Sequence, residues 1–158
     1  MKRLSIAVTA VLIVAFAAAS ALAAGKPIAF VGKYTGTATT KVADNIATIN
    51  ATGTGAGTML GAGKISGLGT GDTSQQPCVP FTGTGSMKGT TGTLTFKVNP
   101  GSSGCGDSDG QLFSVSGKAA VLKGTGKLAK VKGTLKMTGT FDHTSGAFSV
   151  KFSGALTR

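Results

Sequence analysis

From about Lys26 to Arg158 the chain alternates, residue by residue, between Gly or large apolar side chains and Thr, Ser or Lys. In the clearest stretch one parity is Gly133, Leu135, Met137, Gly139 and Phe141, and the other parity holds only Lys and Thr. Successive side chains of a β-strand point to opposite faces, so a period of two indicates strands with one buried and one solvated face. The sequence therefore predicts a half-buried antiparallel sheet.

The first residues have the composition of an export signal. Lys2 and Arg3 precede an apolar run from Leu4 to Ala19, and Ala21-Leu22-Ala23 supplies the small-residue pattern at which signal peptidase cuts. We predict a cleaved signal peptide at 1–23, a single domain at 24–158, and a protein that is secreted, either extracellular or periplasmic. The alternative is a retained membrane anchor, although the run is shorter than the ~20 residues that a spanning helix needs. No later stretch of the sequence predicts a transmembrane helix.

Eight extended segments follow, joined mostly by short connections of turn-forming residues. They are expected near 28–40, 45–54, 64–72, 79–88, 91–98, 111–122, 131–141 and 147–157, with longer loops at 73–77 and 99–110. Sequential short hairpins with alternation throughout predict an all-β fold, an eight-stranded antiparallel up-and-down barrel, because closure removes exposed strand edges.

Alternation alone does not decide which parity faces inward. We expect the apolar parity inside, with Phe96, Phe113, Val115, Leu135, Phe148, Val150 and Phe152 buried. The reverse orientation would describe an outer-membrane barrel with lysines such as Lys136 in a narrow lumen, and the chain lacks the aromatic girdles of such barrels.

Cys78 and Cys105, 27 positions apart, lie at the two longer loops. In an exported chain two such cysteines are expected to form a structural disulfide, worth roughly 3–4 kcal/mol in the chain-entropy model. A metal site would need more ligands than two thiols and the distant His143, so no metal or other cofactor is expected.

The chain is strongly basic, with a formal charge of +11 that falls to +9 once Lys2 and Arg3 leave with the signal. An anionic cell-surface polymer is therefore a possible partner. The lysines are scattered singly along the polar parity, which equally suits residues that solubilise the strand faces. With one Tyr, no Trp and no recognisable motif, no nucleic-acid binding is expected.

The segment Gly124–Gly133 (GTGKLAKVKG) resembles the G-T-G-x-[LF]-A-x-[AV]-x-G signature that precedes a late strand in the allene oxide cyclase/dirigent-like barrel superfamily and related secreted bacterial barrels. In that reading the glycines turn the chain, Leu128 and Val131 plug the end of the barrel, and Gly133 opens the next strand. The resemblance implies a barrel of eight strands and, for function, a cofactor-free isomerase or lyase. We match none of those families' acid/base residues here, so no catalytic residue is assigned.

Three functions remain open. The leading hypothesis is a non-catalytic secreted barrel that binds a small apolar ligand or a surface partner. The second is a cofactor-free isomerase or lyase, and the third is a structural or cell-surface adhesion module. The interior candidates for ligand contact are Tyr34, Phe96, Phe113, Phe148 and Phe152. A hollow barrel with a buried polar group would favour the first two functions, and an interior filled by Phe the third.

Overall fold

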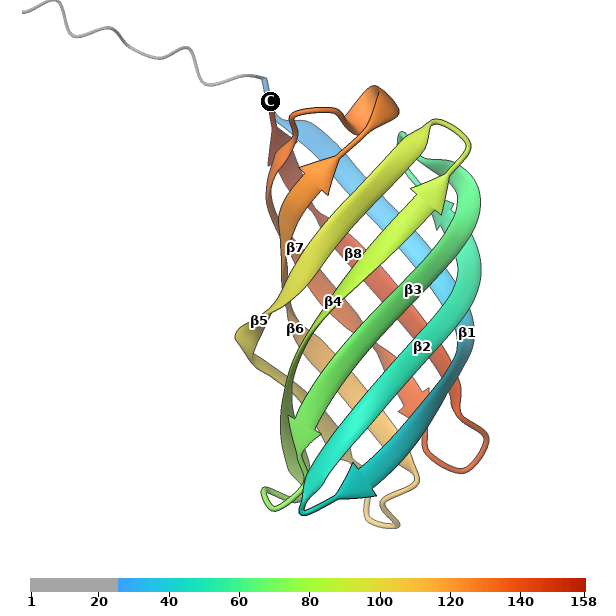
Figure 1. The fold of residues 1–158 in the computed structure, drawn as a ribbon, viewed down its shortest axis with the longest axis vertical. Helices are drawn as coiled ribbons and strands as arrows, with labels where there is room; N and C mark the ends of the chain where they lie inside the picture. Colours follow the sequence, from blue (N-terminus) through green and yellow to red (C-terminus); the bar gives the residue numbers. More distant parts are fainter. Residues whose placement is uncertain (1–25) are drawn as a thin grey trace, which may run out of the picture.

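The computed structural model describes residues 26–158, so the signal peptide predicted at 1–23 lies outside the described residues. Eight antiparallel strands form one closed barrel in which each strand pairs with the next along the chain and the last pairs with the first (Figure 1). The all-β up-and-down barrel is therefore confirmed. The strands are β1 (Ile28–Ala43), β2 (Ile46–Gly57), β3 (Gly61–Asp72), β4 (Cys78–Gly89), β5 (Gly92–Gly106), β6 (Leu112–Gly124), β7 (Lys132–Asp142) and β8 (Ala147–Thr157).

The apolar parity faces the interior, as expected. On β7, Leu135 and Met137 are buried whereas Thr134 and Lys136 are exposed, and on β8 Phe152 is buried between exposed Lys151 and half-buried Ser153. The reverse orientation, with apolar side chains outward around a polar lumen, is not observed. The outer surface of the strands is instead formed largely by Thr, Ser and Lys.

The expected segments agree with the strands to within a few residues at most ends, but the loop expected at 99–110 is wrong. β5 continues to Gly106, and its second half pairs with β4 from Ser102–Phe81 to Cys105–Cys78. A bulge between Val98 and Ser103, with Gly101 at φ 85°, interrupts the pairing of the strand. Beyond that bulge the inward positions are Ser and Gly, so no apolar alternation marks the strand in the sequence.

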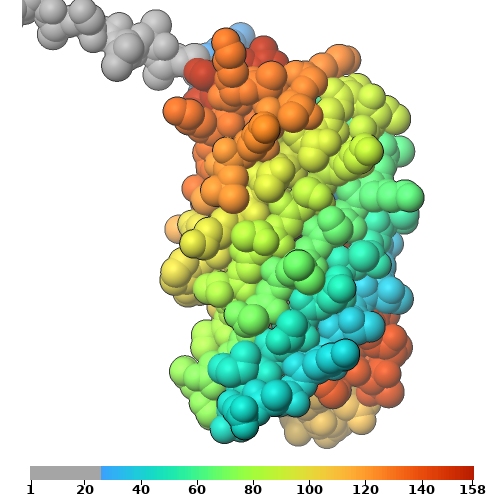
Figure 2. Space-filling model, viewed as in Figure 1, coloured from blue at the N-terminus to red at the C-terminus, as the bar shows by residue number. Residues whose placement is uncertain are grey.

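One end of the barrel, the plugged end, is closed by side chains and by turns that are hydrogen-bonded to one another. The 3-10 turn η1 (Gly126–Leu128) lies between β6 and β7, and Leu128 and Val131 are buried there as expected. The Lys127 N–H donates to Thr91 O, and the Thr91 N–H donates to Leu60 O, which joins three connections. In the space-filling view the orange residues around η1 lie at this end of the barrel (Figure 2).

The opposite end, the open end, is formed by the other four connections, at 44–45, 73–77, 107–111 and 143–146. The only helical element in residues 26–158 is the three-residue η1 turn, and no helix described here is long and apolar enough to cross a membrane.

Candidate ligand-binding cavity

The half of the barrel next to the open end contains a cavity of about 420 Å³. On one side the inward positions of β2, β3 and β4 carry mostly Gly and Ala, and we call this the glycine wall: Ala47, Ala51, Gly67, Gly69 and Gly83. On the other side β5–β8 supply the aromatic wall: Phe96, Phe113, Phe141, Phe148 and Phe152. The side chains of the glycine wall are small, and the rings of the opposite wall do not reach across. The space between the two walls therefore stays unfilled.

Glycine serves two different purposes in this half. At Gly83 a Cβ would lie 2.4 Å from Leu68 O and 2.8 Å from Gly69 Cα, so close backbone approach of β3 and β4 requires Gly. At Gly67 a Cβ would meet only Thr84 O at 3.5 Å, and at Gly104 only the Phe113 ring at 3.7 Å. Both of these positions have room for a side chain, so their glycines keep the cavity open.

Four of the five expected contact residues lie in this cavity: Phe96, Phe113, Phe148 and Phe152. Phe96 and Phe152 are buried and their ring centroids are 5.2 Å apart. Phe113, Val115, Phe148 and Val150 are half-buried, whereas the alternation predicts that they are buried. The difference arises because these side chains border the cavity, which admits solvent, instead of a packed core.

Tyr34, the fifth candidate, points elsewhere. Its side chain is buried, but it is not among the described residues that line the cavity. The hydroxyl lies 3.1 Å from where a Cβ of Gly57 would be, whereas the strand partner of Tyr34 is Gly55. The ring therefore leans toward the plugged end, where burial raises the pKa of its hydroxyl.

The mouth of the cavity carries an aromatic group that we did not predict as a site. The Phe141 ring centroid is 6.3 Å from those of Phe113 and His143, and exposed His143 lines the cavity. Phe141 shares the inward parity of Leu135 and Met137, so the alternation of β7 could have identified it. Nothing in the sequence indicates that His143, in a hairpin connection, lies beside these rings.

Thr40 supplies a polar group to the cavity wall. In residues 26–158, its Oγ1 is the one buried side-chain polar atom without a hydrogen-bond partner. Thr40 lies on the inward parity of β1 and lines the cavity. A hydroxyl both donates and accepts, and leaving it unpaired when buried costs about 1–3 kcal/mol. The oxygen is covered by protein atoms, so a bound molecule would reach it only after the side chain turns.

All five Asp residues of the chain lie at the open end: Asp44, Asp72, Asp107, Asp109 and Asp142. The Asp142 carboxylate accepts bonds from the Ser145 and Thr144 N–H groups at 2.9 and 2.8 Å, and these bonds, chiefly that from Ser145, lower its pKa. The bond from the Ser74 hydroxyl, more than other contacts, lowers the pKa of Asp72. Both carboxylates stay ionised at neutral pH, so the mouth is negatively charged.

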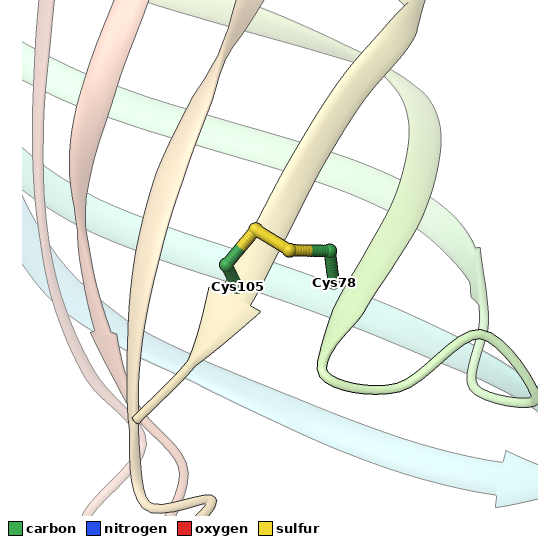
Figure 3. The surroundings of a disulfide bond; sticks show 2 residues. All are labelled: Cys78 and Cys105. Carbon is green, nitrogen blue, oxygen red and sulfur yellow. A yellow bond between two sulfur atoms is a disulfide. The ribbon is translucent and has the colours of Figure 1, made fainter. Parts of the chain in front are cut away.

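The expected disulfide is present at the same end. Cys78, the first residue of β4, is bonded to Cys105 near the end of β5, with an S–S distance of 2.06 Å and a Cα–Cα distance of 3.9 Å (Figure 3). The two residues are direct partners in the ladder, and the Gly106 N–H donates to Pro77 O next to them. The bond ties the β3–β4 and β5–β6 connections together at the mouth.

Within residues 26–158, no three His, Cys, Asp or Glu side chains converge as metal ligands. The Asp107 carboxylate instead accepts bonds from the Gln111 and Leu112 N–H groups and shapes its loop. Among known proteins, no family, characterised protein or solved structure matches this chain.

Proposed function

We propose that this protein is an exported, non-catalytic barrel that binds a small apolar ligand, uncharged or cationic, in the cavity at its open end. The observation that supports this most directly is the hollow half of the barrel between the glycine wall and the aromatic wall. Ligand pockets typically measure about 300–1,000 Å³ and combine apolar walls with a few polar groups. A volume of about 420 Å³ between largely apolar walls, with exposed His143 at the mouth, fits that description.

The aromatic wall supports an apolar ligand in particular. Phe113, Phe141 and Phe148 are half-buried, so an apolar molecule between them and the glycine wall would remove their remaining surface from water. A module that acts only through its outer surface has no need of this arrangement. The hollow interior therefore favours ligand binding over the structural or adhesion role.

The charge at the mouth restricts the ligand further. A carboxylate or phosphate would enter past five Asp side chains, with exposed Lys41 near the end of β1 as a counter-charge. An uncharged or cationic molecule meets no such repulsion. We therefore exclude fatty-acid-like anions from the ligand class.

The distribution of titratable groups supports binding over catalysis. Acid–base chemistry needs a titratable side chain within hydrogen-bond reach of the reacting atoms. Of the described residues that line the cavity, His143 alone has an ionisable side chain, and it is exposed at the mouth. Tyr34 leans the other way, and the Asp142 carboxylate is bonded within its own turn. This favours binding over the isomerase or lyase activity that the family resemblance implies.

Kinship with the allene oxide cyclase/dirigent-like barrels and export by the N-terminal signal are part of the same proposal. The first is supported by the closed eight-stranded barrel and by the position of the Gly124–Gly133 segment, whose Leu128 and Val131 plug one end. The second is supported by the sequence of residues 1–23 and by a disulfide, which forms and persists in oxidising compartments.

A fluorescent probe tests the proposed site. The mature protein is titrated with N-phenyl-1-naphthylamine, an uncharged apolar dye, and we expect saturable binding with one site per barrel. The double variant Gly67→Val/Gly104→Val places side chains in the cavity at the two positions with room for a Cβ, and should lose the binding. The matched control Ala62→Val/Ser103→Val adds the same side chains at outward positions of the same two strands, neither of which lines the cavity, and should keep it. Equal binding by both variants would refute the site.

Competition then tests the ligand class. Octanol, octylammonium and octanoate share one chain and differ in charge, and each is used to displace the dye at low ionic strength. We expect octanoate to compete about three- to tenfold more weakly than octanol, because the acidic mouth repels it. Equal competition by all three would leave the cavity as a binding site and overturn the charge selectivity.

A further inference from the structure

The charged residues of this barrel are segregated along its axis. All five Asp lie in or beside the connections of the open end, whereas four cations lie close together at the plugged end and form what we call the basic cap: Lys127, Lys130, Lys132 and Arg158. Lys26 and Lys123 flank the cap, and all six side chains are exposed. The described part of the plugged end contains no acidic residue.

The four residues of the basic cap are held beside one another. The Arg158 guanidinium donates to the Lys127 carbonyl oxygen, and Lys132 is the ladder partner of Thr157, the neighbour of Arg158. The segment that carries the lysines is fixed by Leu128 and Val131, which are buried beneath it. In Figure 1 the η1 turn and the C-terminus lie at the same end of the barrel. The backbone that carries the four cations is therefore held in place.

Like charges grouped with no acidic side chain among them repel one another, and an anionic partner removes that cost. We propose that the basic cap docks this barrel, reversibly, on an anionic lipid surface. A planar lipid surface can contact all four cations of the cap at once, because they lie together at one end of the barrel. It fits the cations of the barrel wall less well. The wall lysines Lys33, Lys151, Lys136 and Lys118 follow four successive strands around the convex side, so a plane reaches only some of them.

The composition of the cap defines the mode of docking. None of the exposed large apolar side chains of the described chain lies between residues 125 and 132, and Leu122 at 58% exposure is the nearest in sequence. The cap has no apolar anchor to insert, so attraction to lipid headgroups is electrostatic and is screened by salt. Docking by this end turns the mouth of the cavity toward the solution, where a ligand can enter.

Two charge-matched variants test the proposal. The cap variant is K127Q/K130Q/K132Q/R158Q, and the wall variant is K33Q/K118Q/K136Q/K151Q; each removes four positive charges. Co-sedimentation is measured with vesicles of phosphatidylglycerol and phosphatidylcholine, and with phosphatidylcholine alone, at 50 and 500 mM salt. Circular dichroism and thermal unfolding confirm that both variants are folded. A third variant, K127R/K130R/K132R, keeps the charge and should bind like the original chain.

We expect binding to the anionic vesicles alone, lost at high salt, and about tenfold or more weaker for the cap variant than for the wall variant. Equal loss in both variants would show that only net charge matters and would overturn the proposal. No binding of the original chain would also overturn it. Tighter binding to soluble polyphosphate than to vesicles at equal phosphate concentration would assign the cap to a linear polymer instead of a lipid surface.

Discussion

The two halves of the barrel share one alternating pattern and differ in the volume of the side chains that fill the interior. At the plugged end the interior is filled by strand residues Met87, Leu94 and Leu156 and by Leu60 and Leu128 from the connections, all fully buried. At the open end the inward positions of β2–β4 are mostly Gly and Ala, and the rings of β5–β8 face a cavity. The pattern determines which side of a strand faces inward, whereas the sizes of the inward side chains determine whether the barrel is packed or hollow.

The two halves also differ in charge. The packed half ends in the basic cap, and the hollow half ends in the acidic mouth with its disulfide. The same barrel is therefore divided into a half built for stability and a half built for access. Four predictions test this division, in order of decreasing effect.

The largest difference is expected between core residues of the two halves. Leu128→Ala removes a fully buried side chain from the plug and should lower the free energy of unfolding by about 3–5 kcal/mol. Phe148→Ala removes a half-buried ring from the cavity wall. Because this ring lacks packing partners on its cavity side, the substitution should lower the free energy of unfolding by less than about 2 kcal/mol. Urea unfolding followed by circular dichroism measures both. A cost for Phe148→Ala as large as that for Leu128→Ala would mean that the open half is packed too.

The strands of both halves and the disulfide of the open half can be predicted from the sequence. The difference in packing between the two halves cannot. Alternation identifies eight strands, and the lysines of the polar parity indicate that the apolar parity faces inward. Two cysteines in a chain with an export signal predict their bond, although both lie in strands and not in the loops where they were expected. The strand after Val98 escapes prediction because its inward residues are Ser and Gly. Parity places Tyr34 inside, but whether a ring leans up or down the barrel depends on which neighbours leave space. An inward Gly can be required by the close approach of a neighbouring backbone, or it can leave room for a cavity. Which of the two applies depends on the distance between strands, and no local sequence pattern encodes that distance.

The disulfide should stabilise chiefly the open half. The variant Cys78→Ser/Cys105→Ser should unfold about 2–4 kcal/mol more easily, because the unfolded chain regains the freedom of a loop closed across 27 positions. In the folded state, hydrogen exchange should increase in the open-end parts of β4 and β5 and stay unchanged around Leu94 and Leu128. An equal increase at both ends would show that the bond does not act locally.

The next prediction separates glycines that the backbone needs from those that leave the cavity open. Gly83→Ala brings a Cβ to 2.4 Å from Leu68 O and should destabilise the barrel by about 1–3 kcal/mol. Gly67→Ala meets only Thr84 O at 3.5 Å, and should leave stability unchanged or raise it by less than about 1 kcal/mol. Thermal unfolding of the two variants, which make the same chemical change on adjacent strands, gives the answer. Equal destabilisation would mean that the glycine wall is a backbone requirement throughout.

The smallest effect concerns the acidic mouth and its dependence on pH. Hydrogen bonds from Ser145 and Thr144 keep the pKa of the Asp142 carboxyl below its unfolded value, so the ionised group stabilises its turn above that value. The contribution should be present at neutral pH and disappear as the pH falls through the lowered pKa, below about pH 4. Asp142→Ala should therefore be less stable than the original chain at pH 7, and the difference should close toward pH 2–3, which urea unfolding across that range measures. For Leu128→Ala, whose lost packing at the plugged end involves no carboxylate, the difference should persist over the same range. If the difference in unfolding free energy between Asp142→Ala and the original chain stayed constant with pH, the carboxylate would not stabilise the turn at the mouth. The contrast between a pH-dependent open end and a pH-independent plugged end would then be wrong.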